Sequence, residues 1–306
     1  MSVYTTVERD ALAEWLAPLS VGPLIDYSAI AAGIQNSNYF VSTAKGRWVL
    51  TLFEHIEAQD LAFYLGLQAH LSARGIPCPN PVAAGGNYWR PLAGKPAALF
   101  NCLPGKSLSQ ATPEHCHHLG GVLARIHLAG ADYPDPPPNP CGAEWRARTG
   151  QRLAPRLSPD ERTALMAELA FQSAQDFSQL PRGIVHADLF RDNTLWANDQ
   201  LTGVLDFYFA GEDALLFDLA VVANDWCNDA PSLQALIAGY QQARPLTLHE
   251  RAAWPAMRRA AALRFWLLRL EAREHPRTGS VVTIKDPNEF GTLLQHLRLV
   301  GDVLPG

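Results

Sequence analysis

The stretch from Gly183 to Asp206 limits the possible folds of this chain more than any other part of the sequence. It begins with the apolar run G-I-V, continues through a polar loop, and returns to an apolar run, T-L-W. A further short run, V-L, then ends in the carboxylate of Asp206. Inside the loop, Asp188 and Asn193 follow the spacing H-x-D-L-x-x-x-N, which starts at His186. Strand-like runs around an acid, an amide and a second acid predict a site for phosphoryl transfer.

The spacing is that of the catalytic loop of protein kinases, and each polar residue has a task there. A carboxylate must orient and deprotonate the attacking hydroxyl, and oxygen ligands must hold magnesium against the nucleotide phosphates. Asp188 suits the first task, and Asn193 and Asp206 suit the second. We expect His186 only to brace the loop. The alternative is an ordinary polar turn, which we set aside because all the parts occur in the expected order.

The periodicity of the chain predicts an α+β architecture, a bilobal protein-kinase-like fold. β-type runs between residues 28 and 53, with further runs near 81–83 and 97–100, predict a small antiparallel sheet of about five strands. We expect an N-terminal β-rich nucleotide-binding lobe at 1–101, a hinge at 102–107, and a helical catalytic and substrate lobe at 108–306. Helical spacing indicates helices at 5–17, 57–73, 113–128, 158–177, 214–226, 231–243, 248–273 and 287–300.

Composition narrows the range of partners. With 306 residues and 48% apolar composition, the chain can bury a full core. Its net charge of −5 offers no basic field for nucleic acid or an anionic membrane, so a small-molecule partner fits better. The five cysteines are scattered without C-x-x-C spacing, which favours reduced thiols over disulfides or zinc ligands. Neither a signal peptide nor an apolar run of ~18 residues is recognisable, so we expect a cytoplasmic protein.

The nucleotide contacts are predicted less sharply. Gly33, Ser37 and Asn38 lie between the first two strands, where a kinase places its phosphate-covering loop, although a plain hairpin turn would also contain such residues. The third strand carries Thr51 where protein kinases place a lysine. Another cation must therefore meet the phosphates, and Arg191 or Lys45 is the nearest candidate.

In the hinge, we expect the segment of Asn101 and Leu103 to offer backbone amides to an adenine edge. A loop without a ligand would look the same.

Two acids interrupt the apolar helix at 214–226, and two arginines interrupt that at 248–273. A buried acid needs a partner, so we expect Asp218 to bond the catalytic loop. Asp225 is interpreted as facing the substrate, with a structural salt bridge as the alternative. Arg264 and Arg269 are either paired with buried acids or offered to a substrate carboxylate.

With these residues assembled, the chain resembles the aminoglycoside phosphotransferase and choline kinase superfamily over nearly its whole length, and within it the homoserine kinases. The loop H-A-D-L-F-R-D-N carries the superfamily resemblance. More specific to homoserine kinases are G-I-Q-N-S-N-Y-F-V, V-L-T-L-F-E, N-D-W-C, R-F-W-L-L-R-L-E and K-D-P-N-E-F. The threonine in the second of these looks like a family trait.

The resemblance implies ATP- and Mg²⁺-dependent phosphorylation of the side-chain hydroxyl of L-homoserine, a step of threonine biosynthesis. Asp188 would be the base, and Asn193 and Asp206 would hold the metal. Two other readings stay open: a kinase of the same fold for choline, an aminoglycoside or a sugar, and a non-catalytic nucleotide-binding regulator. The embedded arginines favour an acceptor that carries a carboxylate.

Overall fold

A computed structural model describes residues 4–30, 36–274, 286–300 and 304. The described part of the chain divides into two compact units, one formed by residues up to Pro104 and the other beginning at Gly105. Each unit is described by itself below.

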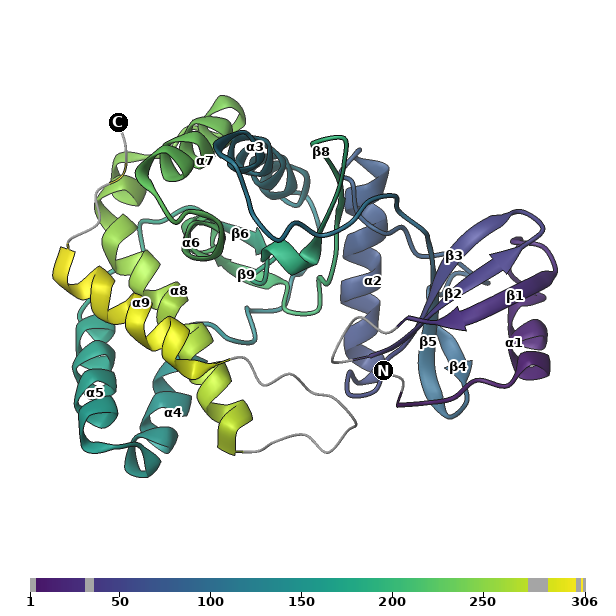
Figure 1. Ribbon diagram of the computed structural model, residues 1–306, viewed down its shortest axis with the longest axis horizontal. Helices are drawn as coiled ribbons and strands as arrows, with labels where there is room; N and C mark the ends of the chain where they lie inside the picture. The colour runs from purple at the N-terminus through teal and green to yellow at the C-terminus, as the bar shows by residue number, and fades with distance from the viewer. Residues whose placement is uncertain (1–3, 31–35, 275–285, 301–303, 305–306) are drawn as a thin grey trace. The chain divides into compact units, whose positions relative to one another are not determined.

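The first unit is built on a five-stranded antiparallel sheet in the order β1-β2-β3-β5-β4 (Figure 1). Its elements are α1 (Arg9–Leu16), β1 (Leu24–Ala29), β2 (Ser37–Thr43), β3 (Gly46–Leu52), α2 (Ala58–Ala73), β4 (Arg90–Leu92) and β5 (Lys95–Asn101). Along β2, buried and half-buried residues alternate, as expected for a strand with one face on a core. The register sets Thr51 opposite Asn38 on β2 and Ala98 on β5.

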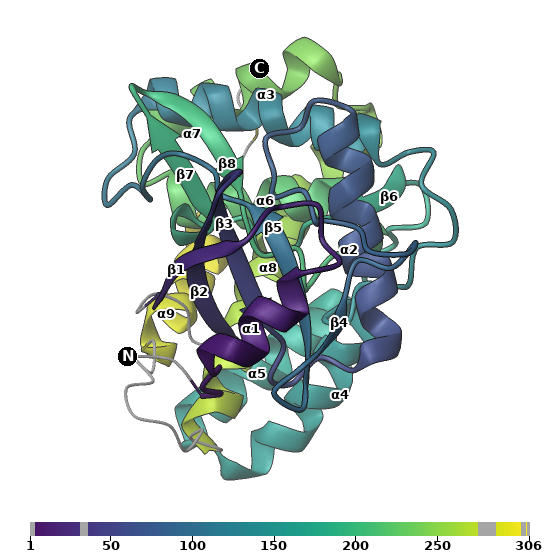
Figure 2. The ribbon, with the colours of Figure 1, turned by 90° about the vertical axis from the view of Figure 1, so that its right-hand side faces the viewer.

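Helix α1 covers one face of this sheet, and Figures 1 and 2 show α2 on the side away from it. The core under α1 contains Leu12, Trp15, Leu16, Tyr39, Val41, Leu50, Leu52 and Leu99. All are nearly free of solvent contact, so apolar burial is what holds α1 on the sheet.

The second unit is mainly helical. Its helices are α3 (Pro113–Ala129), α4 (Ala143–Leu153), α5 (Pro159–Ser173), α6 (Leu215–Trp226), α7 (Ala230–Ala243), α8 (Leu248–Glu274) and α9 (Pro287–Val300), with the 3₁₀ turns η1 (Ala154–Arg156) and η2 (Arg191–Asn193). Four short strands form two antiparallel pairs: β6 (Arg182–Val185) with β9 (Gly211–Ala214), and β7 (Thr194–Ala197) with β8 (Gln200–Val204). The loop that holds Asp188 joins β6 to η2.

Helix α6 lies at the centre of this unit, and Figure 1 shows it end-on with α3, α7 and α8 around it. Every residue from Leu215 to Ala223 is buried, including Asp218. A helix that is apolar on all sides can exist in water only when other elements enclose it. The sequence from 214 to 226 therefore specifies the interior of the unit.

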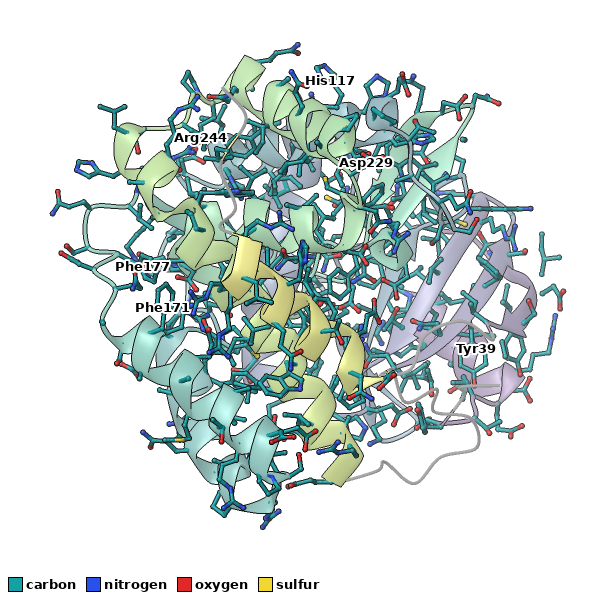
Figure 3. The ribbon with its side chains drawn as sticks, turned by 60° about the vertical axis from the view of Figure 1, so that its left-hand side comes forward. Tyr39, His117, Phe171, Phe177, Asp229 and Arg244 are labelled. Carbon is teal, nitrogen blue, oxygen red and sulfur yellow. The ribbon has the colours of Figure 1, made fainter. Side chains whose placement is uncertain are left out.

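Helices α3 and α7 make the most intimate contact between elements of the unit. A Cβ atom on Gly120 would overlap the carbonyl oxygen of Leu236, and one on Gly239 would overlap that of His117. The two glycines thus allow the backbones to touch. Figure 3 labels His117 on α3 and Asp229, whose carboxylate caps the start of α7 by accepting the Ser232 N–H at 2.8 Å.

The predicted α+β architecture is confirmed, as are the five-stranded sheet and all eight predicted helices, whose bounds shift by a few residues. The strand expected near 81–83 is wrong: Pro81 makes only an isolated bridge to Phe100, and the remaining strand of the sheet is β4. Helix α4 was not predicted. Its buried residues include Arg146, Thr149 and Gly150, so it lacks the apolar stripe that marks a helix in sequence. In the described ranges, no helix has both the length and the apolar character needed to span a bilayer.

Candidate active site

The catalytic loop is held in an unusual backbone conformation by a buried acid. Ala187 has φ +64°, a left-handed conformation that costs a residue with a Cβ atom on the order of 1 kcal/mol. The N–H groups of His186 and Ala187 donate to Oδ2 and Oδ1 of Asp218 at 2.6 and 2.7 Å. These bonds to a charged acceptor offset the strain. Asp218 therefore bonds the catalytic loop, as its place in an apolar helix indicated.

A histidine that the sequence did not single out completes this anchor. His127 on α3 donates from Nε2 to Asp218 Oδ2 at 3.2 Å, and its Nδ1 lies 2.7 Å from the Tyr240 hydroxyl. Burial would raise the pKa of Asp218, but the hydrogen bond and charge of His127, with the backbone N–H of His186, outweigh it and lower that pKa. Asp218 is thus a fully engaged carboxylate. The sequence feature that could have indicated a buried role for His127 is its position among the apolar residues of 119–128.

His186 links the loop to Leu205, the residue that lies between β8 and Asp206. Its Nε2 donates to the Leu205 carbonyl at 2.8 Å, and its Nδ1 accepts the N–H of Asp188 at 3.2 Å. Burial lowers the pKa of His186, which keeps the ring neutral, as this pattern of one donor and one acceptor requires. Leu205 also donates its N–H to the Asn193 carbonyl at 2.8 Å. Loop residues therefore grip both sides of the residue next to Asp206.

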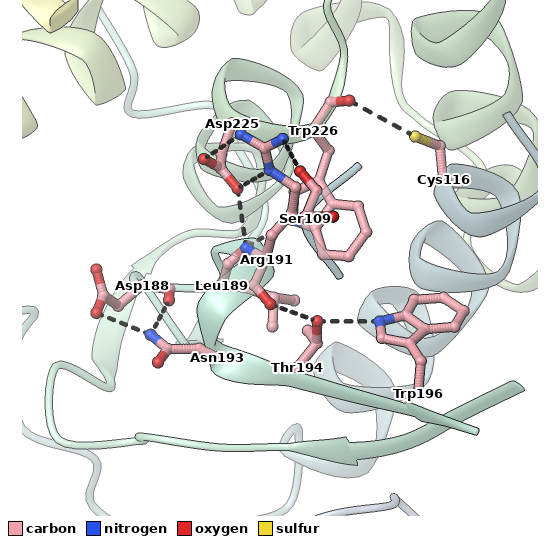
Figure 4. Close-up of polar contacts among 10 residues, drawn as sticks. All are labelled: Ser109, Cys116, Asp188, Leu189, Arg191, Asn193, Thr194, Trp196, Asp225 and Trp226. Carbon is pink, nitrogen blue, oxygen red and sulfur yellow. Dashed lines mark hydrogen bonds and ion pairs between the residues drawn. The ribbon is translucent and has the colours of Figure 1, made fainter. Parts of the chain in front are cut away.

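Asp188 and Asn193 are bonded directly to each other (Figure 4). The Asn193 Nδ2 donates to the Asp188 carbonyl at 2.8 Å and to its carboxylate Oδ2 at 3.1 Å. This arrangement uses the amide nitrogen and leaves the amide oxygen of Asn193 as the atom suited to a cation. One contact thus orients both an acid and a candidate metal ligand.

Asp206 has the features of a carboxylate that can bind a cation. It adopts φ +62°, and its buried Oδ1 accepts no hydrogen bond from the described residues. Burial raises the pKa of Asp206 to about 6, with the nearby charge of Asp192 acting the same way and the Tyr208 N–H opposing it. An orphaned buried carboxylate oxygen is costly without a partner.

A divalent cation fits this site. Oxygen ligands from one carboxylate and one amide suit Mg²⁺, which usually takes few ligands from the protein and the rest from phosphates and water. In the described ranges, no cluster of three or more His, Cys, Asp or Glu side chains could hold a metal alone. Asp206 and Asn193 are consistent with a metal that is shared with nucleotide phosphates.

Arg264 on α8 lies against Asp188. Its Nη1 donates to the Ala187 carbonyl and is 3.5 Å from Asp188 Oδ1. Of the alternatives open at the sequence level, the structure shows Arg264 beside an acid of the catalytic loop. Its side chain is fully buried, while that of Asp188 is 16% exposed.

Arg191 and Asp225 are paired with each other (Figure 4). Asp225 Oδ2 accepts the backbone N–H of Arg191 at 2.9 Å and its Nε–H at 3.2 Å. The guanidinium also donates to the Ser109 carbonyl at 3.4 Å. The structure therefore places Asp225 in an ion pair that fixes the start of η2.

Arg269 and Lys45 each form hydrogen bonds to residues outside the catalytic loop. Arg269 Nη1 donates to Glu289 on α9 at 2.6 Å and to the Asp286 carbonyl at 2.8 Å. Lys45 donates to the Ser20 carbonyl at 3.0 Å.

In the first unit, Gly33 lies outside the described residues. The Ser37 hydroxyl donates to Glu54 at 2.6 Å and accepts the N–H groups of Tyr4 and Thr5. It anchors the amino-terminal segment. Asn38 Oδ1 accepts the Thr51 hydroxyl at 2.8 Å, so a neutral hydrogen-bonded pair occupies the position where protein kinases carry a lysine.

The expected hinge segment is partly engaged already. Asn101 donates its N–H to the Asn80 carbonyl at 3.3 Å, and its Oδ1 accepts the Asn80 N–H at 2.6 Å. Cys102 donates its N–H to the Arg47 carbonyl at 3.4 Å. Of the two predicted adenine contacts, Asn101 therefore has its amide bonded within the sheet unit, and Leu103 is the better candidate.

Comparison with known proteins shows the family of this chain. A model of the phosphotransferase enzyme family matches residues 26–263. The homoserine kinase of Methylobacillus flagellatus is 47% identical over 303 residues, covering 97% of this chain and 95% of that protein. That of Neisseria meningitidis serogroup B is 41% identical over 304 residues, covering 97% and 100%.

Solved structures share the fold at low sequence identity. Amicoumacin kinase hAmiN, in complex with AMP-PNP, Ca²⁺ and Ami, matches with a TM-score of 0.69 at 16% identity, covering 95% of this chain and 92% of that one. Choline kinase from Cryptosporidium parvum matches with a TM-score of 0.65 at 13% identity, covering 90% and 88%. The predicted kinase-like fold is thereby confirmed. This chain belongs to the phosphotransferase enzyme family and, within it, to the homoserine kinases.

Proposed function

We propose that the protein transfers the terminal phosphoryl group of ATP to the side-chain hydroxyl of L-homoserine, giving O-phospho-L-homoserine and ADP. The relatives at 41–47% identity carry the acceptor assignment, since they match nearly the whole chain. The observation that carries the chemistry is the pair of Asp188 and Asn193, which are bonded to each other, with Asn193 also bonded to Leu205, the residue before Asp206. This reaction is a step of threonine biosynthesis.

Asp188 is the proposed base. Its carboxylate is 16% exposed, so a substrate hydroxyl has access to it. It orients the hydroxyl and takes its proton as the oxygen bonds to the terminal phosphorus and the bond to ADP breaks. His186 is neutral and uses both ring nitrogens in the loop, so it takes no part in proton transfer.

Asp206 and Asn193 would hold Mg²⁺, each through a side-chain oxygen. When bound, the metal neutralises charge on the phosphate oxygens as the phosphoryl group moves. Asp206 supports this assignment best, because its buried Oδ1 accepts no bond from the described residues.

For the nucleotide, we propose Leu103 at the adenine edge, Asn38 near the phosphates, and Arg191 as their cation. The ion pair with Asp225 would fix the Arg191 guanidinium in place.

For the acceptor carboxylate, we propose Arg269. Its carboxylate partner, Glu289, has a side chain that is 64% exposed, so a ligand carboxylate can replace it. Asp225 is a weaker candidate for the acceptor, since Arg191 already occupies its carboxylate.

The test is an ADP-release assay over L-homoserine, choline, kanamycin and methylthioribose. L-Homoserine should give the highest kcat/KM, and absence of turnover with it would refute the acceptor assignment. Asp188→Asn should lower kcat by about 10²–10⁴-fold and leave ATP binding intact. Asp199→Asn is the matched control, because this carboxylate lies in the β7–β8 turn with its side chain 91% exposed. Normal turnover in the Asp188 variant would remove the base from the mechanism.

A further inference from the structure

Arg264 is a buried cation whose position needs an explanation. Its side chain has no exposed surface, and its Nη1 donates to the carbonyl of Ala187 and faces Asp188 Oδ1 at 3.5 Å. Its Nε and Nη2 are buried without a hydrogen-bond partner among the described residues. Burying a guanidinium whose N–H groups are only partly hydrogen-bonded costs a fold on the order of several kcal/mol. Arg264 is therefore a poor choice for stability alone.

Two aromatic rings lie against this guanidinium. Its carbon lies 4.7 Å from the ring centre of Phe209 and 4.2 Å from that of Phe265. Contacts of this kind attract a cation to the ring face and restrict its rotation. Arg264 consequently presents Nη1 to the loop in one orientation.

The result is that both oxygens of the Asp188 carboxylate have a neighbour that directs them. Oδ2 accepts the Asn193 amide at 3.1 Å, and Oδ1 faces Arg264. The same Nη1 holds the carbonyl of Ala187, the residue with the left-handed backbone that precedes the acid. A base held from both sides and through its backbone is preorganised for proton transfer.

We infer that Arg264 is a positioning residue, which acts on the reaction through Asp188 and does not contact the acceptor. This inference rests on the proposed function, because it takes Asp188 as the base. This role differs from recognition of the acceptor carboxylate. The Arg264 guanidinium is fully buried and cannot reach a ligand carboxylate in this structure.

Steady-state kinetics of Arg264→Met and Arg264→Lys test the inference. A positioning role predicts that Arg264→Met lowers kcat by about 10–100-fold, the scale of a base displaced by about 1 Å, with KM for L-homoserine nearly unchanged. Arg264→Lys keeps the charge and loses the planar fork, so it should recover part of kcat. A large rise in KM for L-homoserine with kcat preserved would overturn the inference in favour of substrate binding.

A double-mutant cycle asks whether the arginine works through the acid. If it does, the variant with both Asp188→Asn and Arg264→Met should be no slower than Asp188→Asn alone. Losses that multiply would show an independent role and overturn the inference. Different results would refute the two proposals. A fully active Asp188→Asn would refute the proposed role of Asp188 as base, whereas a fully active Arg264→Met together with an impaired Asp188→Asn would refute only the inference about Arg264.

Folding must be separated from catalysis. Arg258→Met is the matched control, since Arg258 is also a buried arginine of α8 and its Nε donates to Asn224 at 2.8 Å. Circular dichroism and a cooperative thermal transition should show that both variants are folded, and only the Arg264 variant should lower kcat. If Arg264→Met does not fold, Arg264→Lys replaces it in the kinetics. The double-mutant cycle then combines Asp188→Asn with Arg264→Lys and answers the same question. Equal kcat losses for the arginines at 258 and 264 would show a merely structural role.

Discussion

Two aspartates of the second unit, the buried Asp218 and the half-buried Asp206, should respond to the same substitution with opposite changes in stability. Asp218 accepts the N–H groups of His186 and Ala187 and a bond from His127, whereas Oδ1 of Asp206 accepts none from the described residues. We expect Asp218→Asn to destabilise the fold and Asp206→Asn to stabilise the metal-free protein.

The magnitude for Asp206 follows from its pKa, which burial raises from 3.8 to about 6. Between these values the folded protein binds a proton on Asp206 that the unfolded chain has released. The free energy of unfolding therefore falls as pH rises from 3.8 to about 6, and the full penalty of about 3 kcal/mol applies above that range. Asp206→Asn removes this penalty, so its advantage over wild type should be largest at pH 7.5 and vanish near pH 4.

The magnitude for Asp218 follows from its partners. An asparagine offers one acceptor oxygen, so one of the two backbone N–H donors would face an amide NH₂ group instead. Loss of a charged acceptor from such a network costs about 3–5 kcal/mol. The pKa of Asp218 is lowered, so this stabilisation is present at neutral pH and is lost only as pH falls through the folded pKa.

The assay is urea unfolding followed by far-UV circular dichroism, in EDTA, at pH 7.5 and pH 4.5. Mg²⁺ with a non-hydrolysable ATP analogue should raise the stability of wild type and leave Asp206→Asn unchanged. If Asp206→Asn were no more stable than wild type at pH 7.5 without metal, the account of Asp206 as an unpartnered carboxylate would be wrong.

Other substitutions probe the packing of the second unit. Gly239→Ala should destabilise the fold by about 1–3 kcal/mol or more, because its Cβ would overlap the His117 carbonyl oxygen. Gly121→Ala on α3 meets its nearest atom at 3.6 Å, so it should be neutral or stabilise the fold by up to about 1 kcal/mol. Thermal unfolding of the two variants compares these effects. Ser158→Ala should lower stability by about 1 kcal/mol, since the Ser158 hydroxyl and Glu161 cap the start of α5 reciprocally, and an unchanged Tm would contradict that.

Patterns with a fixed period were predicted well from sequence. Helix α8 was expected at 248–273 and spans Leu248–Glu274, because its apolar residues recur at helical spacing. The loop of Asp188 was recognisable because residue types and order both match a known chemistry. Asp218 could be assigned to the loop because a buried acid requires donors.

Pairings across the fold could not be predicted in the same way. His127 lies 91 residues from Asp218, and nothing local distinguishes it from any histidine on a buried helix face. The choice of Arg191 as partner for Asp225 depends on the backbone of η2. Helix α4 turns polar residues toward the body of the unit, which local periodicity cannot reveal.

The tie between the catalytic loop and α6 bears on how this enzyme can lose activity. Asp218 belongs to the most enclosed helix of its unit, and it grips the backbone immediately before the proposed base. Fraying at the surface or loosening of a chain end does not break the hydrogen bonds from the catalytic loop to Asp218. Heat inactivation should therefore accompany collapse of the whole helical body, which makes the lifetime of catalysis a property of the core and not of the loop.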